Sequence, residues 1–229
     1  MSKVHIDYSL YLVTDRNLSR GRSTLDIISA AIDGGVTMVQ LREKELSTRE
    51  FLHDGLKIRD LLKSRNIPLI INDRMDIALA LDSDGIHIGQ DDMPLAMVRK
   101  ILGPEKIIGV SVINADEARD AENGGADYLG LSPIFVTATK PELTRQIGIK
   151  GIGLIKKAVH IPLVGIGSMS AGNAFEAVSA GLDGVAVVSG IVSQEDVTAA
   201  ARAIKAEVMR AKGLFLNGIT PGELKGGNK

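Results

Sequence analysis

The sequence predicts a single (β/α)8 TIM barrel, an α/β fold, and three observations support this fold class. Eight short apolar runs alternate with eight helical segments over 229 residues, near the roughly 250 residues typical of such barrels. The apolar runs are continuous, as in strands buried on both faces of a parallel sheet. Glycine-containing junctions at 33–36, 124–127 and 180–185 each close a helix and open a strand, which indicates repeated strand–helix units.

Each predicted strand is a short apolar run that ends in polar residues or glycine. We expect them at residues 8–13, 36–41, 68–71, 85–88, 106–110, 126–131, 161–165 and 182–187. An open doubly wound sheet usually has fewer strands, so this count favours a closed barrel.

Capping residues and glycine pairs define the helices between these strands. Ser23 or Thr24 can cap the first helix, Ser47 and Glu50 have the form of a capping box, and Asn114 can cap the fifth helix. We expect helices over 24–31, from 48 to the residue before 68, over 75–81, from 94, and over 115–123, 151–159, 171–180 and 194–212. Residues 1–212 then form one barrel domain, and 213–229, rich in Gly and Lys, form a flexible C-terminal tail.

The composition excludes several classes of function. A net charge of −1 gives no electrostatic basis for binding nucleic acid or an acidic membrane surface. The lack of cysteine excludes disulfides and thiolate chemistry. No apolar run approaches the roughly 20 residues of a membrane span, and the N-terminus lacks a signal-peptide pattern. We therefore expect a cytoplasmic protein that acts on small molecules; a homo-oligomer is compatible with the sequence.

Two carboxylates, Asp73 and Asp92, are the centre of the predicted site. Each follows a predicted strand, at 68–71 and 85–88, and a short helix separates the two strands. Parallel neighbours place their carboxyl ends at the same edge of the sheet, so the two side chains should meet. Such a pair suits a hard divalent cation such as Mg2+.

The residues that follow the other predicted strands should converge on the same mouth of the barrel. They are rich in cations and hydroxyls and contain no Ser-His-Asp arrangement, so they suit phosphate binding rather than covalent acyl chemistry. One anion site is expected after strands seven and eight, at Gly167-Ser168 and Val188-Ser189. A second site near the metal pair would gather Arg42, Lys44, Ser111, Thr139 and Lys140. A metal ion with several cations suggests a diphosphate at this second site.

Several of these residues also have a purely structural explanation. Asp73 could cap the helix after it, and we expect one of Asp91 and Asp92 to cap the helix that Pro94 begins. His87 lies in an apolar run and is interpreted as a packed core histidine. The charges at 42–44 could form a solvated cluster, and the glycines at 165, 167 and 190 could serve tight turns. Their common placement at strand ends favours the functional interpretation.

Eight segments, in order and with compatible spacing, carry a family resemblance from about residue 8 to about residue 210. They are Tyr11-Leu12-Val13-Thr14-Asp15-Arg16, Val39-Gln40-Leu41-Arg42-Glu43-Lys44, Ile71-Asn72-Asp73, Gly85-Ile86-His87-Ile88-Gly89-Gln90-Asp91-Asp92, Gly109-Val110-Ser111, Gly125-Ala126-Asp127-Tyr128-Leu129-Gly130, Thr137-Ala138-Thr139-Lys140 and Gly165-Ile166-Gly167. Together they resemble the thiamine-phosphate synthase family. The resemblance implies a (β/α)8 barrel that joins 4-amino-2-methyl-5-(diphosphooxymethyl)pyrimidine to a thiazole phosphate, giving thiamine phosphate and diphosphate.

The resemblance also implies roles for the residues of the mouth. The pyrimidine diphosphate would contact Gln40, Leu41, Arg42, Glu43, Lys44 and Asn72. Mg2+ would be bound by Asp73 and Asp92. The diphosphate and pyrimidine would also contact Ser111 and Lys140. The thiazole phosphate would contact Thr137, Ala138, Thr139, Gly167, Ser168, Val188 and Ser189. The implied catalytic set is Arg42, Lys44, Ser111 and Lys140.

One departure from the family pattern concerns the turn after strand seven. The family usually has two consecutive glycines there, whereas this chain has Ser168 in the second place, with a backbone amide that can still donate to a phosphate. Two other functions were weighed: a thiazole tautomerase, which needs no metal pair, and a non-catalytic thiamine-phosphate sensor. The retention of Asp73, Asp92, Arg42, Lys44 and Lys140 together argues against a tautomerase. A complete metal site argues against a sensor.

Overall fold

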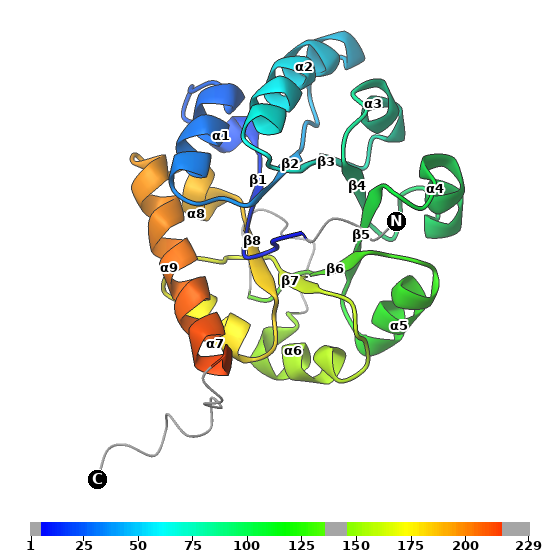
Figure 1. Cartoon of the computed structure of the whole chain (residues 1–229), viewed down its shortest axis with the longest axis vertical. Coiled ribbons are helices and arrows are strands. Elements are labelled where there is room, and N and C mark those ends of the chain that lie inside the picture. Colours follow the sequence, from blue (N-terminus) through cyan, green and yellow to red (C-terminus); the bar gives the residue numbers. More distant parts are fainter. Residues whose placement is uncertain (1–5, 136–145, 217–229) are drawn as a thin grey trace.

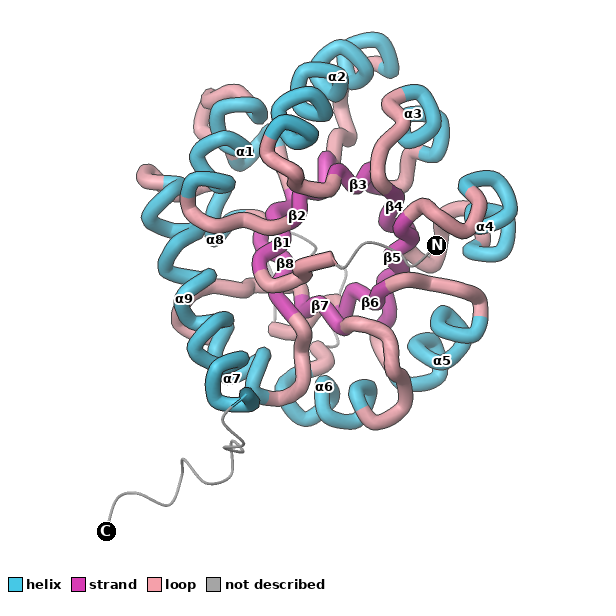
Figure 2. The backbone as a smooth tube through the Cα atoms, in the orientation of Figure 1, coloured by secondary structure: helices cyan, strands magenta, loops and turns pink. Residues whose placement is uncertain are grey.

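The computed structural model describes residues 6–135 and 146–216 and confirms the (β/α)8 barrel. Eight parallel strands close on themselves because β1 pairs with both β2 and β8, and helices form a ring outside them (Figures 1 and 2). Every strand overlaps its prediction. The strands are β1 (Leu10–Val13), β2 (Met38–Leu41), β3 (Leu69–Asn72), β4 (Gly85–Ile88), β5 (Ile107–Val112), β6 (Tyr128–Leu131), β7 (Leu163–Gly165) and β8 (Gly184–Val187).

The helices follow the predicted alternation with three differences in detail. They are η1 (Arg16–Leu18), α1 (Thr24–Asp33), α2 (Thr48–Ser64), α3 (Met75–Ala80), α4 (Leu95–Leu102), α5 (Ala115–Asn123), α6 (Gly148–Lys156), α7 (Ala174–Ser179), α8 (Ser189–Val192) and α9 (Val197–Leu216). The short helices η1 and α8 were not predicted. Helix α6 begins before the expected residue 151. The last helix passes the expected domain end at 212, and the rest of the expected tail lies outside the described residues.

The predicted helix caps are present. The Ser23 side chain accepts a hydrogen bond from the Asp26 amide, and Ser47 and Glu50 form a capping box. The Asn114 side chain accepts from two backbone amides of α5. These bonds satisfy amides that have no partner within the helix, which fixes where each helix begins.

Side chains alternate between two separate apolar layers. One layer lies between the strands and the surrounding helices, and the other fills the barrel lumen. The lumen layer is formed by Tyr8, Tyr11, Val13, Met38, Ile70, Ile107, Tyr128, Val164 and Ala186. Tyr128 lies at its centre, with its ring centroid 5.3 Å from that of Tyr8 and 5.9 Å from that of Tyr11. The filled lumen leaves a mouth at the carboxyl ends of the strands and no open pore.

The opposite end of the barrel carries a repeated hydrogen bond. A side chain just before each even-numbered strand accepts the backbone N–H at the start of the preceding odd-numbered strand, at donor–acceptor distances of 2.8 to 3.1 Å. The pairs are Thr37 with Leu10, Asp84 with Leu69, Asp127 with Ile108, and Asp183 with Leu163. We call these four side chains the strand-start belt. In the parts of the chain that the structure describes, no helix is apolar and long enough to cross a bilayer.

Candidate active site

A cavity opens at the carboxyl ends of the strands, and residues from all eight strands or the loops after them line it. Eight of the predicted site residues lie in its wall: Gln40, Arg42, Asn72, Ser111, Gly167, Ser168, Val188 and Ser189. These eight residues therefore lie together at the mouth of the barrel. The predicted contacts Thr137, Ala138, Thr139 and Lys140 lie outside the described residues.

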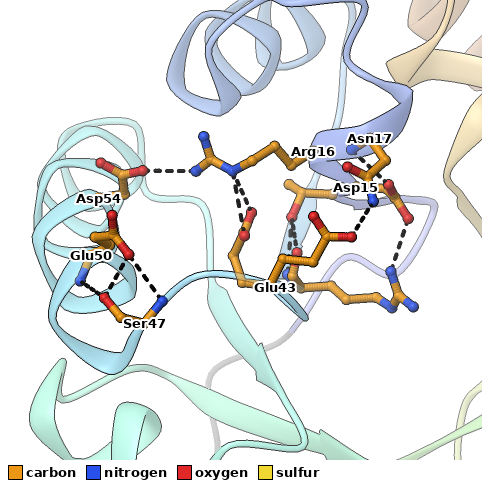
Figure 3. A network of polar contacts seen from close by, with 10 residues as sticks. Asp15, Arg16, Asn17, Glu43, Ser47, Glu50 and Asp54 are labelled. Atoms are coloured by element: carbon orange, nitrogen blue, oxygen red, sulfur yellow. Dashed lines mark hydrogen bonds and ion pairs between the residues drawn. The ribbon is translucent and has the colours of Figure 1, made fainter.

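The side chains from Gln40 to Lys44 do not all face the cavity. Strand β2 points Gln40 into the lumen, whereas Leu41 packs into the layer between strands and helices. The Glu43 side chain is 4% exposed and lies 3.4 Å from the Arg16 Nε (Figure 3). Neither Leu41 nor Glu43 lines the cavity, although both were expected to contact substrate. The alternation of side chains along a strand was the sequence pattern that could have separated Gln40 from Leu41.

Glu43 is part of a network that fixes the loops beside the mouth. Arg16 lies between Glu43 and Asp54, with its Nη2 atom 2.8 Å from an Asp54 oxygen (Figure 3). Burial raises the pKa of Glu43, and Arg16 opposes that rise. This network ties the loop after β1 to the loop after β2 and to helix α2, so it stabilises the wall from outside.

Arg42 is held by the loop after β1. Its Nη1 atom donates to Asp15 Oδ2 at 2.9 Å, and its backbone N–H donates to the Thr14 hydroxyl oxygen at 2.9 Å. The Arg42 side chain is only 24% exposed, so it is not a member of a solvated charge cluster. Asp15 also lines the cavity, and the sequence reading assigned it no role. The position of Asp15 directly after the first predicted strand is the sequence feature that could have placed it at the mouth.

Asp73 and Asp92 meet at the rim of the mouth, as the sequence predicted. Lys44 Nζ lies 2.6 Å from Asp73 Oδ2, and Asp92 Oδ2 accepts the Gly89 N–H at 2.7 Å. Neither carboxylate caps a helix, because α3 begins after Arg74 and α4 after Pro94, both without a side-chain cap. The expectation that Asp91 or Asp92 caps the helix at 95 is therefore wrong.

The two carboxylates carry opposite pKa shifts. Burial acts to raise the pKa of Asp73, but hydrogen bonds from Lys44 and from Asp92 outweigh it and lower that pKa. Burial, with the neighbouring Asp73 charge, raises the pKa of Asp92 above the usual range of a carboxyl. Two adjacent carboxylates beside a single lysine form a site suited to added positive charge.

The donor set fits Mg2+ bound together with a substrate phosphate. Within residues 6–135 and 146–216, no group of three or more His, Cys, Asp or Glu could hold a metal. Mg2+ commonly uses one or two carboxylates and completes its shell with water and phosphate oxygens. A pair at an open rim meets this requirement.

A chain of hydrogen bonds lies beneath the mouth. It joins Gln40 to Tyr11, Tyr11 to Tyr128, Tyr128 to His87 Nδ1, and His87 Nε2 to the Ser111 hydroxyl, each at 2.9 Å. We call these five residues the lumen chain. His87 is buried, but its ring nitrogens bind polar atoms of the lumen, so it is more than an apolar packing residue. Tyr11 and Tyr128 were not identified from the sequence as polar residues of the site.

The turn after β7 has the backbone of a glycine pair. Gly167 has φ +109°, and a Cβ atom there would lie 2.9 Å from Pro133 Cβ, so glycine is required by both conformation and space. Ser168 has φ +51°, in the left-handed region that non-glycine residues seldom adopt. Asn173 stabilises this turn by donating to the Ser168 carbonyl at 2.8 Å and accepting from the Ser170 amide at 2.9 Å.

Comparison with known proteins identifies relatives across most of the chain. Residues 10–191 match the family model described as thiamine monophosphate synthase. A thiamine-phosphate synthase of Chloroflexus aurantiacus is 52% identical over 209 residues, covering 91% of this chain and 96% of that protein. One from Moorella thermoacetica is 48% identical over 206 residues, covering 90% of this chain and 98% of that protein.

Solved structures show the same similarity. Thiamine phosphate pyrophosphorylase from Pyrococcus furiosus superposes with a TM-score of 0.83 at 37% identity, covering 90% of this chain and 97% of that chain. A 3-hexulose-6-phosphate synthase superposes with a TM-score of 0.63 at 15% identity, covering 87% of this chain and 99% of that chain, and shares the fold alone.

Proposed function

This chain belongs to the thiamine monophosphate synthase family, and we propose that its barrel mouth performs the reaction with the residues described above. The protein is a transferase that acts as a thiamine-phosphate synthase in thiamine biosynthesis. It joins a pyrimidine diphosphate to a thiazole phosphate. The observation that carries the residue assignment is the single cavity wall shared by Gln40, Arg42, Ser111 and the turn at 167–168.

The proposal assigns one anion to each of two opposite sides of the mouth. Arg42 and Lys44 lie on the side of the rim that holds Asp73 and Asp92, and this side would bind the diphosphate. The opposite part of the wall carries Gly167 and Ser168 after β7 and Val188 and Ser189 after β8. Backbone amides in such loops suit a monophosphate, so this part would bind the thiazole phosphate. The two substrates would then meet over the centre of the lumen.

The reaction needs charge stabilisation more than proton transfer. The bond between the pyrimidine methylene carbon and the diphosphate oxygen breaks, and its electron pair leaves with the diphosphate. The thiazole nitrogen then donates its lone pair to that carbon and forms the new carbon–nitrogen bond. This nitrogen carries no proton to remove, so no general base is required. The Arg42 guanidinium and the Ser111 hydroxyl would stabilise the charge that grows on the leaving group.

Mg2+ dependence is part of this proposal. Asp73 and Asp92 would hold the ion, and Lys44 would then be released from Asp73 toward the diphosphate. When bound, Mg2+ would supply further neutralisation of the diphosphate oxygens. The pKa of Asp92, raised by burial and by the neighbouring Asp73 charge, supports the assignment because a cation would relieve that repulsion. A cytoplasmic location and a homo-oligomeric state stay predictions from the sequence.

The two other functions weighed from the sequence gain no support. The relatives described above are named as synthases or pyrophosphorylases, and their similarity covers about nine tenths of this chain. A tautomerase would have no use for the carboxylate pair, and a sensor would have no use for cations placed beside a leaving group.

Turnover with purified substrates tests the proposed function. We expect the protein to form thiamine phosphate and diphosphate from the two substrates with Mg2+, to stop after chelation, and to recover when Mg2+ is restored. Isomerisation of the thiazole phosphate without joining would identify a tautomerase instead. Full turnover in metal-free protein would contradict the proposed metal pair while leaving the synthase activity intact.

A further inference from the structure

The lumen chain of Gln40, Tyr11, Tyr128, His87 and Ser111 has a direction. Each tyrosine hydroxyl has one proton to donate, so a continuous chain through two hydroxyls must run one way or the other. Burial raises the pKa of both tyrosines, so both hydroxyls keep their protons. If the donor is known at one end of the chain, the donor and acceptor of every other bond in the chain follow from it.

The Gln40 end sets the direction. Its Nε2 atom donates to the Tyr11 oxygen at 2.9 Å. The buried Tyr11 hydroxyl proton also needs an acceptor, and the Tyr128 oxygen lies 2.9 Å away, so this proton is assigned to the bond with Tyr128. Tyr128, having accepted that bond, donates its proton to His87 Nδ1. A neutral histidine that accepts at Nδ1 carries its proton on Nε2, and this proton is donated to the Ser111 oxygen.

We infer that Tyr11 and Tyr128 are positioning residues that hold His87 as its Nε2–H tautomer and thereby turn the Ser111 hydroxyl proton toward the mouth. This inference rests on the proposed function, in which Ser111 meets an anionic oxygen of the diphosphate. Tyr11 and Tyr128 are each 1% exposed at the base of the cavity, and their proposed effect is transmitted through His87 and Ser111.

The opposite direction would disable Ser111 as a donor. His87 would then carry its proton on Nδ1, and Ser111 would give its proton to Nε2. Only lone pairs of the Ser111 oxygen would face the anion, which repels them. The direction of the chain therefore decides whether this residue attracts or repels a phosphate oxygen.

The packing around the chain keeps its rings in place. Gly109 faces the Tyr128 ring, and a Cβ atom there would overlap it. A Cβ atom at Gly130 would lie 2.8 Å from His87 Cε1. Strands β5 and β6 thus use glycine where the two rings need the space, so the hydrogen-bond distances follow from the barrel itself.

Nitrogen NMR of histidine side chains tests the tautomer without any substrate. With 15N-labelled histidine, the His87 signals are identified by their loss in His87→Gln. We expect a bare Nδ1 and a protonated Nε2 in the parent protein. Tyr128→Phe removes the donor to Nδ1 and should shift the population toward the Nδ1–H tautomer. Tyr8→Phe is the matched control, because its ring packs on Tyr128 but lies outside the chain, and it should leave the tautomer unchanged.

Kinetic coupling tests the consequence for Ser111. Loss of one hydrogen bond to a charged group should lower kcat by about tenfold in Tyr128→Phe, with little change in the KM of the thiazole phosphate. Because Tyr128 acts through Ser111, adding Ser111→Ala to this variant should cause little further loss.

An Nδ1–H tautomer in the parent protein would overturn the inference, as would fully additive losses in the double variant. The tautomer measurement on the parent needs no variant to fold and no substrate to react. The tautomer result is therefore valid even if the protein lacks the proposed synthase activity. A wrong tautomer prediction would not exclude that activity, and a lack of activity would not exclude the predicted tautomer.

Discussion

At the scale of single residues, Arg42 depends on partners in the loop after β1. Asp15 accepts its guanidinium at 2.9 Å, and the Thr14 hydroxyl accepts its backbone N–H. A diphosphate-binding arginine that is already oriented loses less side-chain freedom when the substrate binds. In the proposed function, the contact between Asp15 and Arg42 would be part of the binding site.

Asp15→Asn should lower kcat/KM for the pyrimidine diphosphate by about tenfold, the scale of one charge-assisted hydrogen bond. Steady-state kinetics with the pyrimidine diphosphate varied would measure this effect. Asp54→Asn is the matched control, because Asp54 pairs with Arg16 instead and lies outside the cavity wall. Equal losses in the two variants would show that Asp15 has only a general structural role.

Ser168→Gly should leave activity unchanged and the protein at least as stable. Ser168 holds φ +51°, where a non-glycine residue costs roughly 1–2 kcal/mol. Glycine offsets this gain by roughly 0.5–1 kcal/mol through its greater freedom in the unfolded chain. Thermal unfolding and the KM for the thiazole phosphate are the two measurements. A large rise in that KM would show that the Ser168 side chain itself binds the phosphate.

Asp92→Asn should raise the stability of the metal-free protein at neutral pH while abolishing activity that depends on Mg2+. The pKa of Asp92 is raised in the folded protein, so ionised Asp92 costs folding free energy above that pKa. Below it, Asp92 is neutral like asparagine, and the advantage of the variant should disappear. Thermal midpoints across an acidic to neutral pH series in a chelator would follow this change. An advantage that grows on acidification has the wrong sign and would contradict the proposed pair.

At the scale of elements, the strand-start belt fixes the end of the barrel away from the mouth. Asp127 accepts the Ile108 N–H at 2.8 Å and the Arg99 guanidinium at 2.6 Å, which ties α4 to the start of β5. The same bond recurs at every second strand, so four strand pairs are each anchored independently. These bonds contribute to stability at the end of the barrel opposite the mouth.

Asp127→Ala should lower the free energy of unfolding by about 1–3 kcal/mol, because it leaves the Ile108 amide without its acceptor and removes the carboxylate partner of Arg99. The folded variant should keep its kcat, since the belt lies at the opposite end from the mouth. Asp60→Ala is a suitable control, because Asp60 lies on helix α2 in an exposed ion pair with the neighbouring Arg59 and should change stability little. Urea unfolding of both variants would decide between a structural anchor and a surface charge.

Local sequence patterns predicted the positions of most helices and strands. Apolar runs located every strand, and Ser23, Ser47 and Asn114 located three helix starts, because a cap binds amides within its own first turn. The helices η1 and α8 were missed because three or four residues are too few to show helical periodicity.

The candidate site was predictable only in part, and for a physical reason. Strand ends placed Asp73, Asp92 and Ser111 at the mouth from sequence alone. The lumen chain depends on contacts such as Tyr11 with Tyr128, which are 117 positions apart and meet only after the barrel closes. The resemblance placed Leu41 among the substrate contacts, and in the structure its side chain packs between the strands and the helices.

At the scale of the whole molecule, the barrel brings the two proposed anion-binding regions to one mouth over a filled lumen. Diphosphate would lie at Arg42, Asp73 and Asp92, and the thiazole phosphate near Gly167 and Ser189 across the opening. The reacting carbon and nitrogen would then approach each other above His87 and Ser111. This arrangement accounts for the synthesis of one product from two separately anchored substrates.

A crystal structure with thiamine phosphate, diphosphate and Mg2+ bound tests this division most directly. We predict that diphosphate and Mg2+ lie against Asp73, Asp92 and Arg42. We predict that the phosphate of thiamine phosphate lies at the turn of Gly167 and Ser168. Diphosphate found at that turn, away from Asp73 and Asp92, would show that the two ends of the mouth have been assigned in reverse.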